Sequence, residues 1–156
     1  MTITEPITTE KLDGLDVRQF SVFLSNKVGA LLEIVKLLQE NHIAVLGLSI
    51  VDSAESAIGR FVVSDPEKVK DIFEMHLIPF SQCKVLLVEL QEGAAELSKV
   101  LACLLMGEIN ISFSYPLLTR PRGRAVLVVR VDDLDCARNV LLGQDFILLN
   151  QSDISR

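Results

Sequence analysis

Apolar and polar positions along the chain follow two patterns, one typical of amphipathic helices and one typical of strands. In residues 30–40 the apolar side chains recur at the i, i+3, i+4 and i+7 spacing that places them on one face of a helix. Short, largely apolar stretches predict strands at 17–24, 43–51, 58–64 and, as a short fourth strand, 76–80. Asp65 and Pro66 predict the start of a second helix, because aspartate is a favourable N-cap and proline suits the first turn.

The same order of elements recurs in the second half of the chain. Strands are predicted at 84–90, 109–117, 125–131 and 146–149, and helices at 94–106 and, after the Asp132-Asp133 cap, up to 142. At an offset of 66 residues, apolar positions of the two halves coincide, as in Leu31 with Leu97 and Leu38 with Leu104. Self-similarity at a fixed period indicates repeated structural units.

Each half has the βαββαβ order of the ferredoxin-like plan, in which both helices cover one face of a four-stranded antiparallel sheet. The sequence therefore predicts an α+β protein of two ferredoxin-like units packed side by side. The expected division is a tail at 1–16, a first unit at 17–82, a second unit at 83–150 and a tail at 151–156. Each unit is small for a core of its own, so the two are expected to pack together.

Composition narrows the classes of partner. With 49% hydrophobic and 23% charged residues, the chain is too apolar for a disordered protein. No apolar run approaches the ~18 to 20 residues that span a bilayer, and the N-terminus lacks the basic start and apolar stretch of a secretory signal. A net charge of −6, one tyrosine and no tryptophan disfavour contact with a phosphate backbone or with stacked bases. We expect a cytoplasmic protein that binds neither membranes nor nucleic acid.

Candidate catalytic and metal sites are weak. Cys83, Cys103 and Cys136 form an odd set without C-x-x-C spacing, which favours small apolar residues in a reducing compartment. Neither His42 nor His76 has a cysteine, histidine or carboxylate at metal-ligand spacing. The motifs G-x-S-x-G, P-loop and G-x-G-x-x-G are absent. No enzyme activity, metal or cofactor is predicted.

Two clusters of charged residues can be explained without a bound ligand. Arg120, Arg122 and Arg124 lie in a predicted hairpin turn, where they could bind an anion or a partner, although exposed arginines at a turn are more often solvated. The acidic run at 132–135 fits a helix cap and first turn rather than a calcium loop.

A homodimer is predicted from the strands at 86–90 and 125–131. Both are strongly apolar, and Arg130 is the only charge in the second of them. An antiparallel sheet shows a polar face unless both faces are covered. We therefore expect a second chain to cover the sheet face opposite the helices.

The stretch 20–38, FSVFLSNKVGALLEIVKLL, closely resembles the opening of an ACT domain, an apolar strand followed by Asn-x-x-Gly and a leucine-rich helix. Residues 95–115 of the second half match more weakly. The resemblance extends over about residues 17–150 and is to small stand-alone proteins of two tandem ACT domains. It implies a non-catalytic regulatory protein that senses a small ligand, most often an amino acid, at the interface between two ACT domains.

The loop before the first helix is the candidate site. A helix N-terminus presents unpaired N–H groups and partial positive charge to a carboxylate, and Gly29 permits close approach, but a well-capped helix without ligand explains the same residues. The resemblance assigns ligand binding to the residues of this loop and to an asparagine at the start of the second strand of the other unit. These residues are Asn26, Val28, Gly29, Ala30, Leu31 and Asn110.

The second site implied by the resemblance is degenerate. Glu92 and Ala95 replace the loop Asn and Gly in the second half, and Ala44 replaces the strand Asn in the first. Leu24 stands where the serine-sensing ACT domain of phosphoglycerate dehydrogenase has a histidine, which favours an apolar amino acid as ligand. The alternative function is a regulatory subunit, resembling the small subunit of acetolactate synthase, that docks to an enzyme with a weak or lost ligand site.

Overall fold

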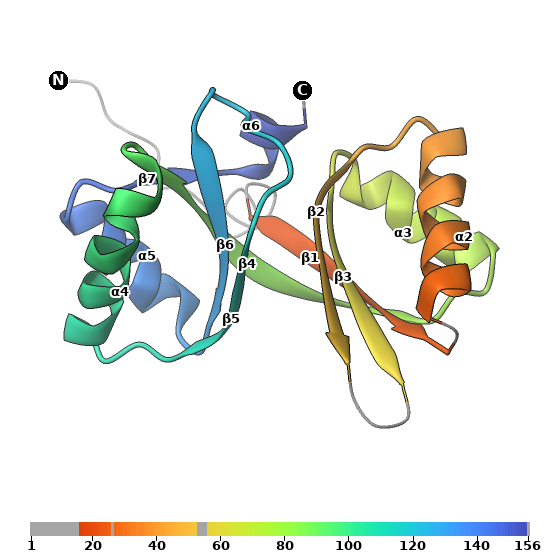
Figure 1. Ribbon diagram of the computed structural model, residues 1–156, viewed down its shortest axis with the longest axis horizontal. Helices are drawn as coiled ribbons and strands as arrows, with labels where there is room; N and C mark the ends of the chain where they lie inside the picture. The colour runs from red at the N-terminus through yellow and green to blue at the C-terminus, as the bar shows by residue number, and fades with distance from the viewer. Residues whose placement is uncertain (1–15, 26, 53–55, 156) are drawn as a thin grey trace, which may run out of the picture.

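The computed structural model describes residues 16–25, 27–52 and 56–155, which form two units joined in one seven-stranded antiparallel sheet (Figure 1). The first unit comprises β1 (Val17–Leu24), α2 (Lys27–Glu40), β2 (Val45–Asp52), β3 (Ala57–Val63), α3 (Pro66–Met75) and the first half of β4 (Phe80–Leu90). The second comprises the rest of β4, the 3-10 helix η1 (Gly93–Glu96), α4 (Leu97–Met106), β5 (Ile111–Pro116), β6 (Ala125–Val131), α5 (Leu134–Gly143) and β7 (Ile147–Leu149), and α6 (Gln151–Ile154) follows. The predicted α+β class with two βαββαβ units is confirmed.

The two units share strand β4. Its first half pairs with β1, from Phe80 opposite Val22 to Val85 opposite Val17, and its second half pairs with β6 from Leu86 onward. The second half also pairs with β7. The strand orders β4-β1-β3-β2 and β7-β4-β6-β5 are therefore equivalent, and the chain passes from one unit to the other without leaving the strand.

The separate short strand predicted at 76–80 is wrong, because residues 76–79 form the turn and the short connection that follow α3. The amide of Ile78 donates to the carbonyl of Phe73 at 2.9 Å, and Leu77 has a φ of +55°, so the chain turns back on the helix. Proline at position 79 has no N–H for a ladder hydrogen bond. The strand begins only at Phe80 and then runs on past the expected boundary between 82 and 83.

Helices cover the two outer faces of the molecule. In Figure 1, α4 and α5 lie on the left, α2 and α3 on the right, and the strands lie between them. The helical spacing seen in the sequence accounts for α2, whose Ile34 and Leu38 are buried against β1 and β3. The equivalent positions of α4, Val100 and Leu104, are buried in the core of the second unit.

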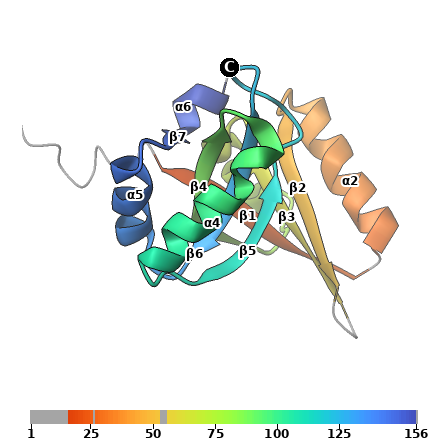
Figure 2. The same ribbon diagram turned by 60° about the vertical axis from the view of Figure 1, so that its left-hand side comes forward.

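A third core lies between the two units, on the sheet faces away from the helices. It contains Val17 and Val62 from the first unit and Leu87 and Val128 from the second, all buried. The sheet curls until its end strands meet, as Figure 2 shows for β2 and β5. The far face is therefore covered, as predicted, but by the other unit of the same chain rather than by a second chain. The homodimer itself stays a prediction.

A polar pair within this third core fixes how the units meet. Tyr115 of β5 donates its hydroxyl to Oε1 of Gln19 of β1 at 2.5 Å, and both side chains are buried. The ring of Phe113 stacks on Tyr115, and the guanidinium of Arg60 from β3 lies 3.6 Å from the centre of the Phe113 ring. Such directional contacts between distant strands favour one arrangement of the units over others.

The buried phenol predicts a loss of stability at alkaline pH. Burial first, and the neighbouring Cys83 second, raise the pKa of Tyr115, and burial also raises the pKa of the Cys103 thiol. Above about pH 10 an unfolded tyrosine loses a proton that the folded one keeps, so folding becomes less favourable as pH rises. Below that pH the contribution of Tyr115 is complete.

The measurement is the free energy of unfolding by urea, from pH 7 to above about pH 10, for the wild type and for Tyr115→Phe. The variant should lose about 1 to 3 kcal/mol at pH 7, because Oε1 of Gln19 is left buried without its donor. It should also show a shallower decline above pH 10. An identical alkaline decline in both proteins would contradict the assignment to Tyr115.

Candidate functional site

The first candidate site is the start of α2. Asn26 lies outside the described residues, and α2 begins at Lys27, earlier than the predicted start at residue 30. Val28 is 77% exposed and Gly29 is also exposed, whereas Ala30 and Leu31 pack against the core of the first unit. The helix has no acidic side chain in its first turn, so its partial positive charge is not neutralised there.

The backbone of Gly29 shows whether its conformation requires glycine or whether the missing side chain serves ligand approach. Gly29 has helical backbone geometry and is not among the residues with positive φ. Alanine adopts that geometry at lower cost, so the turn itself does not require glycine. The missing side chain does leave the backbone of this first turn open to close approach.

Asn110 is engaged elsewhere. Its backbone N–H and its side-chain amide each donate to a carboxylate oxygen of Asp132 at 3.1 Å, and the N–H of Asp132 donates to the Asn110 carbonyl at 3.1 Å. These bonds join the beginning of β5 to the end of β6. Figures 1 and 2 both show the start of α2 and the start of β5 apart, with β2 and β3 between them. One chain thus brings Val28 to Leu31 together but does not add Asn110 to them.

The loop before α4, expected to be degenerate, is closed by its own side chains. The N–H of Glu92 donates to Oε1 of Glu96 at 2.7 Å, and Glu96 is buried. Gly93 has a φ of +66°, and a 3-10 turn stands where the first unit has the first turn of α2. A carboxylate therefore already accepts from the backbone N–H of Glu92.

Two of the three hairpin arginines bind their own chain. Nε of Arg122 lies 3.5 Å from a carboxylate oxygen of the buried Glu89, and Arg124 donates to the Gln91 carbonyl at 2.6 Å. These contacts hold the turn between β5 and β6 against the end of β4. Their first role is structural.

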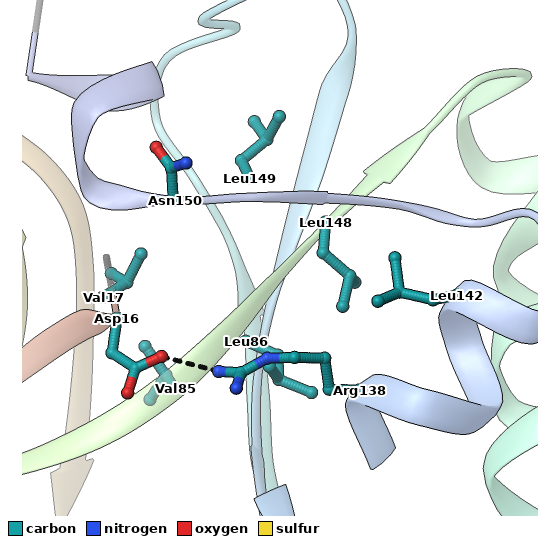
Figure 3. Close-up of a pocket in the computed structure, with 9 residues that line it drawn as sticks. All are labelled: Asp16, Val17, Val85, Leu86, Arg138, Leu142, Leu148, Leu149 and Asn150. Atoms are coloured by element: carbon teal, nitrogen blue, oxygen red, sulfur yellow. Dashed lines mark hydrogen bonds and ion pairs between the residues drawn. The ribbon is translucent and has the colours of Figure 1, made fainter. Parts of the chain in front are cut away.

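The second candidate site is a hollow of about 210 Å³ where the two units meet (Figure 3). It lies beside the point at which β4 passes from one unit to the other. Its walls are mostly aliphatic and come from β1, β4, α5 and β7. The lining residues are Asp16, Val17, Val85, Leu86, Arg138, Leu142, Leu148, Leu149 and Asn150.

Ion pairs to Asp16 supply the charge of this junction pocket. Nη2 of Arg138 lies 2.6 Å from Oδ1 of Asp16, whose side chain is only 9% exposed. Nζ of Lys84 lies 3.1 Å from the other oxygen of Asp16. Asp135, 3.7 Å from Arg138, is 91% exposed and contributes little. Arg138 and Lys84 thus both pair with the shielded carboxylate of Asp16, and Arg138 lies beside an aliphatic wall.

The junction pocket could not be found from sequence. Asp16 falls in the predicted N-terminal tail, and Arg138 is 122 positions away from it in the middle of α5. The side chain of Asn150 has a local explanation, because it caps α6 by accepting from the N–H of Asp153 at 3.0 Å. The aliphatic lining residues fall in predicted strands or at the end of a predicted helix, but nothing in the sequence indicates that they meet.

Within residues 16–25, 27–52 and 56–155, no three His, Cys, Asp or Glu side chains are grouped so that they could hold a metal ion. None of the helices in this part of the chain has the length and apolar character needed to cross a bilayer.

Comparison with known proteins is consistent with this architecture. A family model described as an ACT domain pair matches residues 15–156. Protein BT0572 from Bacteroides thetaiotaomicron is 27% identical with a TM-score of 0.82, over 91% of this chain and 97% of that one. The regulatory subunit of aspartate kinase from Thermus thermophilus, in its ligand-free form, is 16% identical with a TM-score of 0.57, over 83% of this chain and 92% of that one. The corresponding subunit from Thermus flavus is 15% identical with a TM-score of 0.56, over 83% and 92%. No curated protein matches the chain.

Proposed function

The chain belongs to the family of ACT domain pairs, and from this we propose that it is a non-catalytic regulatory protein that binds an amino acid between its two ACT units. The observation that carries the proposal is the junction pocket, which lies between the units and combines an ion pair with aliphatic walls. The regulatory subunits of aspartate kinase have the same fold, which is compatible with a regulatory role.

The chemistry of the junction pocket suits a zwitterion with an apolar side chain. A guanidinium binds a carboxylate through paired hydrogen bonds, so Arg138 would take the ligand carboxylate. Asp16 would take the ammonium group. The side chain would contact Leu142 and Leu148. At about 210 Å³ the hollow is below the size of a drug-binding pocket, which favours a single small amino acid.

The start of α2 remains the second candidate position. Its residues, Asn26, Val28 to Leu31 and Asn110, stay a prediction from the family resemblance, and within one chain Asn110 is hydrogen-bonded to Asp132. A neighbouring unit facing this loop would have to come from a second copy. The two positions can be separated by mutation.

The test is a thermal-shift screen of the twenty amino acids at millimolar concentration, followed by calorimetric titration of any hit. A ligand present at 100 times its dissociation constant adds about 2.7 kcal/mol to the stability of the folded state. We expect an aliphatic amino acid to raise Tm. Arg138→Gln should weaken its binding at least about tenfold, since a charge-assisted hydrogen bond is lost.

Two further variants make the result specific. Asn139→Ala alters an exposed neighbour of Arg138 on α5 and should leave binding unchanged. Asn26→Ala should also leave it unchanged. If Asn26→Ala abolishes the shift in Tm while Arg138→Gln does not, the ligand binds at the start of α2, and its assignment to the junction pocket is wrong.

No shift with any amino acid would overturn the ligand part of the proposal. It would favour the alternative, a regulatory subunit that acts by docking to an enzyme. That alternative predicts a stable complex with an unrelated enzyme, seen by co-purification of the two from lysate.

A further inference from the structure

A row of polar side chains crosses the four strands of the first unit. In the strand ladders Ser49 of β2 is paired with Arg60 of β3, and Arg60 is also paired with Ser21 of β1. Ser21 is in turn paired with Ser81 of β4. Directly paired residues share a face of the sheet, and Val62, two positions from Arg60, is buried in the core between the units. The row therefore lies on the sheet face that meets the second unit, and it holds one guanidinium and three hydroxyl groups.

The second unit brings another guanidinium to this region. Arg130 of β6 is paired with Phe113 of β5 and lies two positions from Val128, which is buried in the core between the units. The guanidinium carbon of Arg60 lies 3.6 Å from the centre of the Phe113 ring, and Figure 2 shows β3 beside β5. The ring of Phe113 thus contacts the arginine of one unit and is the ladder neighbour of the arginine of the other.

The thiol of Cys83 indicates that both guanidinium groups are close. Burial raises the pKa of Cys83, and the positive charges of Arg130 and, to a smaller extent, Arg60 act against this rise. Both guanidinium groups are therefore near enough to the sulfur atom to stabilise its charged form. We call Ser21, Ser49, Arg60, Cys83 and Arg130 the arginine cluster.

Both arginines of the cluster keep N–H groups available. Nη1 of Arg130 donates to the carbonyl of Lys84 at 2.7 Å. Arg60 contacts the Phe113 ring and forms no hydrogen bond to another residue of the described ranges. Within those same ranges neither arginine forms an ion pair with an aspartate or glutamate. Both side chains are half-buried, and a shielded guanidinium without a counter-charge favours the binding of an anion.

We propose that the arginine cluster binds a phosphate group between the two units, as free inorganic phosphate or as the phosphoryl group of a small metabolite. Arg60 and Arg130 would hold the phosphate from different units, and the hydroxyls of Ser21 and Ser49 would donate from the sheet. Donors that approach from several directions suit a tetrahedral oxyanion better than a planar carboxylate. Two guanidinium groups also match the charge of about −1.5 to −2 that a phosphoryl group carries at pH 7.

The arginine cluster is separate from the junction pocket. Along β1, Val17 lines the junction pocket, Ser21 belongs to the cluster, and the buried Gln19 lies between them. No member of the cluster lines the junction pocket. Phosphate binding can therefore be tested without any amino acid, and its failure would leave the proposed amino-acid site untouched.

Calorimetric titration with inorganic phosphate at constant ionic strength tests the proposal. We expect saturable binding of one phosphate per chain. Arg60→Gln and Arg130→Gln should each weaken it at least about tenfold, because a charge-assisted hydrogen bond is lost. Arg120→Gln removes the same charge from an exposed turn and should leave the affinity unchanged. Arg138→Gln, in the junction pocket, should leave it unchanged as well.

Two further measurements do not depend on removing an arginine, which could disturb the fold. Ser49→Ala keeps both charges and should weaken phosphate binding about fivefold, through the loss of one hydroxyl donor. In the wild type, phosphate should slow the alkylation of Cys83 by iodoacetamide severalfold, because a nearby anion disfavours the reactive thiolate. Alkylation of Cys136, followed by mass spectrometry in the same sample, should be unchanged.

Glycerol 3-phosphate and succinate distinguish the sources of the anion. Tighter binding of glycerol 3-phosphate than of phosphate would assign the cluster to the phosphoryl group of a metabolite, and equal or weaker binding would assign it to inorganic phosphate. Succinate bound as tightly as phosphate would overturn the choice of a tetrahedral anion. The absence of saturable binding, an equal loss in Arg120→Gln, or equal slowing of Cys83 and Cys136 would overturn the site.

Discussion

Replacing Leu87 with alanine should lower the free energy of unfolding by about 3 kcal/mol, one of the largest effects expected of a single substitution here. Leu87 is fully buried in the core between the two units. It lies on β4, opposite Val128 of β6 on one side and Leu149 of β7 on the other. The substitution therefore leaves a cavity at the strand that both units share.

Urea unfolding followed by circular dichroism measures the effect, with Leu118→Ala as control. Leu118 is 67% exposed and contributes its backbone N–H to the contact with Leu46, so its side chain should matter by less than about 0.5 kcal/mol. Because β4 is continuous, we expect a single transition in both variants. A loss below about 1 kcal/mol for Leu87→Ala would show that the two units do not depend on this core.

Removing Arg122 should be almost as costly, at about 2 kcal/mol, although its side chain is half exposed. The reason is its partner. Glu89 is 1% exposed, and its Oε2 atom has no hydrogen bond. Its other oxygen accepts from the Gln91 amide at 3.1 Å. Arg122→Ala would thus leave a buried carboxylate without its counter-charge.

A double-mutant cycle identifies the cause. In a Glu89→Gln background the Arg122→Ala substitution should cost less than about 0.5 kcal/mol, because no buried charge remains. Arg120→Ala, in the same turn, is the matched control and should be neutral. Equal costs for Arg122→Ala in both backgrounds would mean that Arg122 acts through packing and not through the Glu89 carboxylate.

Local structure was predictable because local patterns specify it. The spacing of Ile34 and Leu38 defined the buried face of α2, and Asp65 does cap α3 by accepting from the N–H of Lys68 at 3.2 Å. The matching order of elements in the two halves was enough to predict two βαββαβ units. The error at 76–80 arose where an apolar stretch, which strands and helix ends share, was assigned to a strand.

The candidate sites were less predictable, because each joins residues that are far apart in the chain. Asn110, a predicted ligand residue, is hydrogen-bonded to Asp132, which lies 22 positions further on. The junction pocket depends on Asp16 meeting Arg138 across 122 positions. Neither pairing can be recognised in the sequence, because a single contact between distant residues produces no repeating pattern of residue types.

The sequence by itself determined most of the segments that form helices and strands, that the chain repeats, and that both faces of its sheet are covered. Hydrophobic periodicity carries this information, because each element must bury one side of itself wherever it packs. Only the tertiary structure decided what covers each face. The continuous strand β4 and the curl of the sheet bring the far faces of the two units together and leave α4 outside. Burial is a property of a single position, but the identity of its neighbour depends on how the whole sheet closes.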